Sequence, residues 1–453
     1  MRKHREAPLY PVRTCGGGLR FAVFRAALGV LVGCAGGTEL QRHDLAQQLE
    51  NRGAAPIRED LEDHSTGVPK SVVLENGLTS DEAVALALWN NPSFNALLSD
   101  FEVSRSDLEA AGMLPNPTLS ILFPLGPKQL EFWSYWDISF LWQRNGRVEM
   151  ASLRVEEMGA RLVQSGLQLA REARVAHARA KAAESRVDLA ASAVEIWNEI
   201  LRISEVRHSV QAANDIELAS VQTDAKTSQL QAQQFHYDML QSRIELQRTL
   251  GYAIPDHVKL VADALPSTTP PEARLLKLSH SARPDLRAAE LSLEAAARGA
   301  GVADRDIFRI TAIVDANGAG LKGFEMGPGA IVTLPIFNLN GPARDRAKAE
   351  LNRAAFRYLQ VKQQIDLDVR AAQARFAQAR VSLDVWPTEI LQPLSRNVEL
   401  STMAFRAGGT THLAVLESTR RLIDARRQQV DLELALRIAQ ADLMLSVGRK
   451  FYD

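Results

Sequence analysis

The chain has little of what the chemistry of an enzyme requires. Its 453 residues include two cysteines, Cys15 and Cys34, and nine histidines that are scattered without the spacing of metal ligands. No nucleophile elbow, phosphate-binding loop or dinucleotide fingerprint occurs in it. The formal net charge of −1 favours no polyanionic partner such as nucleic acid. These features predict a protein that is not an enzyme and that holds no metal or cofactor.

The chain also lacks any apolar run of the roughly 20 residues that a membrane helix needs. If the protein spans a bilayer, we therefore expect it to do so with strands. A shorter apolar stretch, 21–33, follows a basic segment, which predicts a signal peptide over 1–33. The sequence from Leu31 to Cys34 resembles a bacterial lipobox, which predicts lipidation of Cys34. The alternative is an ordinary export signal; in either case the mature chain has no cysteine pair.

The middle of the chain and its end repeat one another. Asn91-Pro92 returns as Arg283-Pro284, 192 residues later, and Leu250-Gly251 returns as Val447-Gly448, 197 residues later. Such a duplication indicates one structural unit used twice. We expect a leader over 34–77, a first repeat over 78–251, a linker over 252–271, a second repeat over 272–448 and a tail over 449–453.

Each repeat is predicted to hold one very long helix with two shorter ones stacked end to end beside it. Residues 147–210 contain no proline and only Gly159 and Gly166 as glycines, and as one helix they would span ~95 Å. The corresponding long helix of the second repeat contains Pro387 and Pro393, which predict a kink. The shorter helices are expected at 80–112 and 215–250 in the first repeat; the second repeat offers 342–406 as its long helix and 272–303 and 411–448 as its short ones.

Two segments, 117–142 and 309–337, alternate apolar and polar residues with a period of two, as strands with one apolar face do. This pattern fits a pair of hairpins whose apolar face meets lipid. A soluble hairpin packed on a core would alternate in the same way. The residues predicted to face lipid are Leu119, Ile121, Phe132, Trp136, Ile138, Phe140, Trp142, Val332, Leu334 and Ile336.

Three short motifs add a family resemblance. Leu114-Pro115-Asn116-Pro117 precedes the first hairpin, Thr333 to Phe337 precedes Asn340-Gly341-Pro342 after the second, and Phe405-Arg406-Ala407-Gly408-Gly409 precedes the last helix. In this order, and with the duplication, the chain resembles the TolC-type outer-membrane factor family over roughly 78–449.

The resemblance implies a mainly α fold with a small β part. Each subunit of a homotrimer would supply four strands to a twelve-stranded outer-membrane barrel and its coiled-coil helices to a periplasmic tunnel. Four strands alone leave open edges in lipid, so closure requires several copies. A periplasmic adaptor and an inner-membrane pump would be the partners of this exit duct, in tripartite efflux or type I secretion. The rival hypothesis is a lipid-anchored periplasmic scaffold without a pore.

The resemblance also places the periplasmic mouth of the duct at the two turns near 211–218 and 407–413. The family often closes this mouth with acidic residues, although ordinary solvated helix-end charges would look the same. The candidate residues of the tip and gate are Asp215, Glu217, Asp224, Gly408, Gly409, Leu413 and Glu417.

Overall fold

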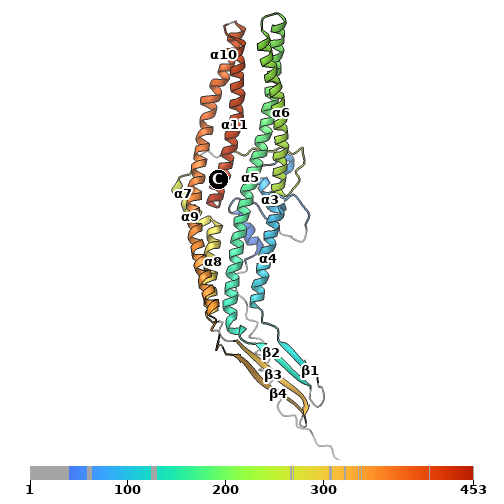
Figure 1. The fold of residues 1–453 in the computed structure, drawn as a ribbon, viewed down its shortest axis with the longest axis vertical. Helices are drawn as coiled ribbons and strands as arrows, with labels where there is room; N and C mark the ends of the chain where they lie inside the picture. Colours follow the sequence, from blue (N-terminus) through green and yellow to red (C-terminus); the bar gives the residue numbers. More distant parts are fainter. Residues whose placement is uncertain are drawn as a thin grey trace, which may run out of the picture. The chain divides into compact units, whose positions relative to one another are not determined.

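The computed structural model describes the chain from residue 40 to residue 451, apart from 59–63, 124–129, 266–267, 269, 306–308, 321–322, 335, 338 and 408. The predicted signal peptide and lipidation site at Cys34 lie outside the described residues, as does the predicted tip residue Gly408. Residues from Leu40 onward form one unit of long helices and a small sheet (Figure 1).

The first repeat contains the elements in the predicted order. They are α2 (Arg42–Glu50), α3 (Ser80–Asn90), α4 (Pro92–Gly112), β1 (Thr118–Leu122), β2 (Glu131–Asp137), α5 (Phe140–Ser209) and α6 (Asp215–Leu250). A capping box begins α3, because Thr79 Oγ1 accepts a hydrogen bond from the Glu82 amide and the Glu82 carboxylate accepts one from the Thr79 amide. Pro92 then breaks the path between α3 and α4.

The second repeat has the same order, except that its long helix is interrupted. Its elements are α7 (Glu272–Ala282), α8 (Pro284–Arg305), β3 (Arg309–Gly320), β4 (Gly323–Thr333), α9 (Gly341–Val385), a π-helical turn (Trp386–Leu391), α10 (Gln392–Arg406) and α11 (His412–Val447). The π turn lies where Pro387 and Pro393 predict a kink, since each proline removes one backbone donor. The Trp386 side chain donates a hydrogen bond to the Ala425 carbonyl, 3.1 Å away, and so fixes the turn to α11.

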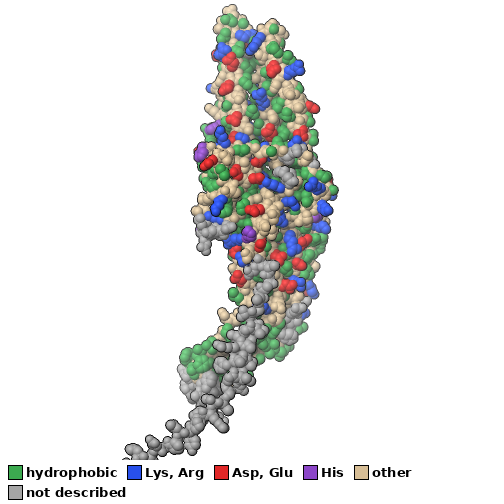
Figure 2. Space-filling model, turned by 180° about the vertical axis from the view of Figure 1, so that it is seen from behind, with side chains coloured by type: hydrophobic (Ala, Val, Ile, Leu, Met, Phe, Trp, Pro, Cys, Tyr) green, Lys and Arg blue, Asp and Glu red, His purple; other side chains and the backbone are tan. Residues whose placement is uncertain are grey.

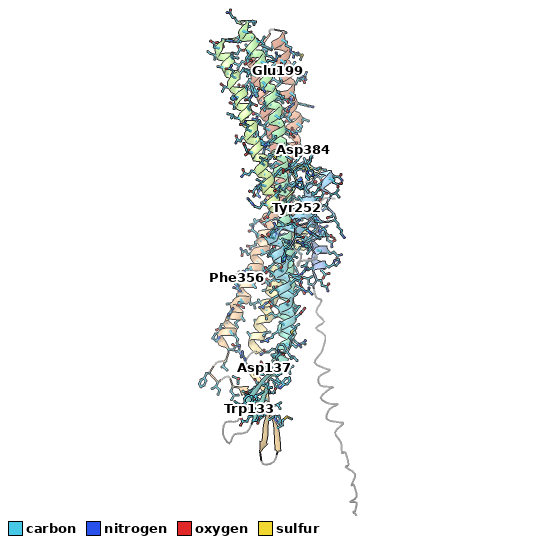
Figure 3. The ribbon with its side chains drawn as sticks, turned by 90° about the vertical axis from the view of Figure 1, so that its right-hand side faces the viewer. Trp133, Asp137, Glu199, Tyr252, Phe356 and Asp384 are labelled. Atoms are coloured by element: carbon cyan, nitrogen blue, oxygen red, sulfur yellow. The ribbon has the colours of Figure 1, made fainter. Side chains whose placement is uncertain are left out.

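The predicted stacking of two short helices along each long one is confirmed. α5 packs against α6 over one half of its length and against α3 and α4 over the other (Figure 1). In the second repeat α9 packs against α7 and α8, and α10 packs against α11. Figure 3 shows the two ends of the first repeat, with Glu199 toward the helix tips, Tyr252 at mid-length and Trp133 in the sheet. The contacts of α5 with α8 and with α11 join the repeats.

A glycine with positive φ ends α6 and α11, the return helices that run back from the turns 211–214 and 407–411. Gly251 (φ 64°) ends α6 at the α3–α4 junction, where a Cβ would stand 2.7 Å from the Asn90 carbonyl oxygen. Gly448 (φ 82°) ends α11 at the α7–α8 junction, where a Cβ would stand 3.1 Å from the Ala282 carbonyl oxygen. These positions need glycine both for the left-handed backbone and for the close approach.

The described part of the leader packs along the first repeat as a strap. Leu45 and Leu49 of α2 are fully buried, and they fill the two notches that Gly159 and Gly166 leave in α5. A Cβ on Gly166 would stand 2.8 Å from Leu49 Cδ2, so these glycines make room for the strap. The same cluster includes Phe94, Leu98 and Phe101 of α4. Smaller clusters lie around Phe376 in the second repeat and around Trp197 toward the tips.

No helix in the described part of the chain combines the length and the apolar composition of a membrane span.

Candidate functional site: a two-faced sheet and the helix tips

The four strands form one antiparallel sheet in the order β1-β2-β3-β4. β2 and β3 pair with Trp136 opposite Ala312, so the sheet is continuous across the two repeats. The other sides of β1 and β4 have no partner strand among the described residues. Free backbone donors and acceptors therefore line both edges.

The strand register gathers the apolar residues on a single face. Leu119 lies opposite Ser134 and Ile121 opposite Phe132, so these residues share a face, because strand neighbours across a ladder point the same way. The apolar face contains Leu119, Ile121, Phe132, Trp136, Ile310, Ala312, Val314, Ala316, Met326, Pro328, Ala330 and Val332, with Ser134 as its polar member. The opposite face carries Thr118, Ser120, Glu131, Tyr135, Asp137, Arg309, Thr311, Asp315 and Thr333, together with Leu122, Trp133, Ile313 and Ile331.

The apolar face is largely uncovered within the described unit. The exposed fraction is 62% for Leu119, 49% for Trp136 and 70% for Met326. Figure 2 shows hydrophobic side chains gathered at the sheet end and charged side chains of both signs spread over the helices. A hairpin packed on a soluble core would bury these residues. The exposure favours a face that meets lipid.

Five of the residues predicted to face lipid lie outside the strands. β2 ends at Asp137, whose Oδ1 accepts a hydrogen bond from the Ser139 amide at 2.9 Å and so turns the chain. Ile138 follows this end, and α5 begins at Phe140, which is buried. The prediction of strand positions was wrong for Ile138, Phe140, Trp142, Leu334 and Ile336.

In the second hairpin the strands extend through most of the glycine-rich stretch 318–327. β3 extends to Gly320 and β4 begins at Gly323, with Met326 opposite Ala316. β4 then ends at Thr333, two residues before Pro335, which lacks the amide that a ladder needs. The alternation of Ile310, Ala312 and Val314 was present in the sequence and could have placed these residues on the apolar face.

At the helix tips most predicted acidic residues pair within their own hairpin. His208 Nε2 lies 2.7 Å from Asp215 Oδ1, and Arg207 Nη1 lies 3.2 Å from Glu217 Oε1. The Asn214 side chain caps α6 by accepting a hydrogen bond from the Glu217 amide. In the second hairpin Glu417 pairs with Arg421, one helical turn away. Gly409 lies in the turn before α11, and Leu413 is 68% exposed in its first turn.

Asp224 differs from these because it joins the two repeats. Arg420 Nη2 of α11 lies 2.7 Å from both carboxylate oxygens of Asp224 on α6. A second cross-repeat contact lies two turns further from the tip, where Arg427 Nη2 donates to Gln231 Oε1 at 3.0 Å. Each pair joins residues 196 positions apart, within the range of the duplication offsets. The sequence singled out Asp224 but did not indicate its partner.

Comparison with known proteins gives one family profile and several solved structures. The profile described as outer membrane efflux protein matches residues 275–449. A comparison with curated protein sequences gives no match. Among solved structures, the outer-membrane channel OprN is similar at 18% identity with a TM-score of 0.69, covering 92% of this chain and 99% of that chain.

Two further solved structures have the same fold. The outer membrane protein VceC of Vibrio cholerae is 16% identical, with a TM-score of 0.68 over 82% of this chain and 97% of that chain. The CmeC outer membrane channel of Campylobacter jejuni is 14% identical, with a TM-score of 0.69 over 92% of this chain and 91% of that chain. The match thus extends over both repeats, whereas the family profile covers the second.

Proposed function

We propose that this protein, which has the fold of the TolC-type outer-membrane channels and matches the outer membrane efflux protein family over residues 275–449, is the outer-membrane exit duct of a tripartite efflux system. The observation that carries the proposal is the sheet with one apolar face and one mainly polar face. An apolar face suits hydrocarbon and a polar face suits a water-filled passage. Solutes would pass through it passively.

The two free sheet edges support assembly into a homotrimer. An open edge in lipid leaves backbone groups unpaired at several kcal/mol each. β4 of one subunit can pair with β1 of the next, and three copies of four strands close a twelve-stranded barrel. The helices also expose large apolar side chains in the described unit, as a subunit interface requires. These residues include Leu230, Tyr237 and Ile244 on α6 and Phe356, Leu359 and Leu367 on α9, of which Phe356 is labelled in Figure 3.

The proposal places the sheet in the bacterial outer membrane and the helices in the periplasm. The tips formed by the α5–α6 and α10–α11 turns would meet a periplasmic adaptor, and an inner-membrane pump would supply the energy. Type I secretion would use the same arrangement. The lipobox-like sequence before Cys34 supports an additional acyl anchor.

The alternative is a lipid-anchored scaffold without a pore. This alternative explains the long helices equally well, but it does not explain an exposed apolar sheet face with open edges. The discriminating experiment is reconstitution of the purified protein in planar bilayers, with its mass measured in detergent. A duct gives discrete conductance steps and a trimer. Monomeric protein that carbonate extracts from membranes and that never conducts would refute the duct.

The acyl anchor has its own test. Cys34→Ser should abolish incorporation of labelled fatty acid while trimers still form in the membrane, since the strands carry the insertion. A Cys34→Ser protein found soluble in the periplasm would show instead that the lipid, and not the sheet, holds the protein.

A further inference from the structure

A groove runs along α5, α8 and α9, in the half of the helical region that adjoins the sheet. α5 and α9 form its sides, and α8 lies recessed between them with small residues such as Ser292, Ala295 and Gly299 at its floor. The groove consists of two adjoining hollows of ≈ 360 and ≈ 480 Å³, which share Ser292, Ala354 and Arg357. The small side chains of α8 give the groove its depth.

The groove opens on the face of α5 opposite the leader strap. Gly159 and Gly166 face the strap residues Leu45 and Leu49. Four groove residues of α5 stand two positions before or after these glycines, and two residues turn an α-helix by about 200°. The α5 residues concerned are Glu157, Arg161, Gln164 and Gln168. In the proposed duct a strap inside the passage would obstruct it, so the strap would lie outside and the groove would face the lumen.

Guanidinium groups outnumber carboxylates in this groove. Arg154 and Arg161 project from α5, and Arg346, Arg353 and Arg357 project from α9. The carboxylates that line the same hollows are Glu157, Glu350 and Asp285, and each is already paired, with Arg161, Arg346 and Arg283 respectively.

Three arginines of the groove take no part in these ion pairs. Arg154, Arg353 and Arg357 are exposed, and none has an ion pair or hydrogen bond to any residue in the described part of the chain. The charges of Arg154 and Arg353 nevertheless act on the Glu350 carboxylate in the groove. The pKa of Glu350 is lowered, first by its hydrogen bond from Arg346 and also by the charges of Arg346, Arg353 and Arg154.

We propose that Arg154, Arg353 and Arg357 form an anion-attracting stretch of the lumen wall, and that the cargo of this duct includes solutes bearing carboxylate or phosphate groups. The inference rests on the proposed duct and adds the class of cargo. Guanidinium groups bind both anions through paired N–H donors. A groove lined by an excess of positive charge raises the local concentration of anions above that in free solution. Three subunits would place three such grooves around one passage.

The test is the ion selectivity of the reconstituted trimer. With potassium chloride at unequal concentrations on the two sides, the reversal potential gives the chloride-to-potassium permeability ratio. In the triple variant Arg154→Gln, Arg353→Gln, Arg357→Gln we expect this ratio to fall by about threefold or more, because the groove loses its excess cations. Inorganic tripolyphosphate should impede the wild-type current and impede the triple variant less.

Two controls accompany the triple variant. The matched lysine variant, with Arg154, Arg353 and Arg357 all changed to Lys, keeps the charge and should keep the wild-type ratio. Arg105→Gln removes an arginine that pairs with Glu102 beside the leader strap, and should leave the ratio unchanged. A conducting triple variant with the wild-type permeability ratio would overturn the anion groove while leaving the duct in place. Wild-type protein that does not conduct would instead overturn the duct itself.

Discussion

The side chain of Asn91 donates a hydrogen bond to the main-chain carbonyl of Thr249, 2.9 Å away. Arg283 makes the equivalent contact in the second repeat, where its Nη1 donates to the carbonyl of Ser446 at 3.1 Å. Each donor precedes a proline that starts a helix, and each acceptor lies two residues before the glycine that ends a return helix. The two motifs that recur in the duplication, the residue before proline and the glycine that ends a helix, therefore contact each other in each repeat. This contact forms a joint at the place where two short helices meet end to end.

This joint predicts an asymmetric sensitivity to alanine. Gly251→Ala should lower the free energy of unfolding by about 1–3 kcal/mol, because a Cβ would meet the Asn90 carbonyl at a positive φ. Gly448→Ala should destabilise less, since its nearest contact is longer. Thermal unfolding in detergent, followed by circular dichroism, measures both. Gly301→Ala, in open space on α8, is the control and should be neutral or stabilising; equal effects at Gly251 and Gly301 would contradict the joint.

The strap predicts that α2 is held by its two leucines. Leu49→Ala should destabilise the strap by about 2–5 kcal/mol, because a fully buried side chain leaves a cavity beside Gly166. Limited proteolysis should then cut the segment 40–58 faster than in the wild type. Gln47→Ala, at an exposed position of the same helix, should digest at the wild-type rate. Faster cutting of both variants alike would point to loss of helix and not of packing.

Two neighbouring residues of β3 test the two faces of the sheet. Val314→Arg places a charge on the apolar face and should cost about 2–4 kcal/mol of insertion free energy if it lies near the bilayer midplane. Ile313→Arg places the same charge on the polar face, where water can solvate it. The measurement is the fraction of protein recovered from membranes as trimer, which should fall for Val314→Arg alone. Equal losses would show that the faces are not in different environments.

The cross-repeat pair at the tips predicts a change in gating. Asp224→Asn removes the carboxylate that holds Arg420 and should raise the open-state population by up to about fivefold, since a partly exposed ion pair contributes at most about 1 kcal/mol. Single-channel recording measures this as open probability. Glu199→Gln breaks a pair with Arg202 on the same helix and should leave gating unchanged. An unaltered open probability in Asp224→Asn would remove Asp224 from the gate.

A buried histidine predicts a pH dependence of stability. His177 donates from Nε2 to the Leu78 carbonyl at 2.8 Å. Burial lowers the pKa of His177 from 6.5; the hydrogen bond to Leu78 and the charge of Asp263 oppose this shift, and the charges of Arg437 and Lys181 add to it. The unfolded chain therefore binds this proton more readily. The contribution of His177 to the free energy of unfolding should be fully present above pH 6.5. It should be lost as the pH falls from 6.5 toward the lower pKa of the folded state.

The matching measurement is thermal unfolding between pH 7.5 and pH 5.5. His177→Gln should flatten this dependence, because glutamine can still donate to Leu78 but does not titrate in this range. His236→Gln, at an exposed position, should keep the wild-type slope. A slope that persists unchanged in His177→Gln would assign the pH dependence to other groups.

The sequence by itself determined the features that depend on local spacing. Freedom from proline predicted the long helix α5, and the period of two predicted which of Leu119, Ile121 and Phe132 share a face. The duplication predicted that both repeats stack their helices in the same way. Each of these follows from residues near one another in the chain, where helix and strand periods act directly.

Only the tertiary structure decided where the strands end and which distant residues meet. Phe140 and Trp142 continue the strand pattern, yet a turn at Asp137 and the packing of α5 make them helical. Arg420 pairs with Asp224, and Leu45 and Leu49 pack at Gly159 and Gly166. Both contacts join segments that are far apart in the chain. Periodicity does not specify such contacts, because they depend on how whole helices lie against one another.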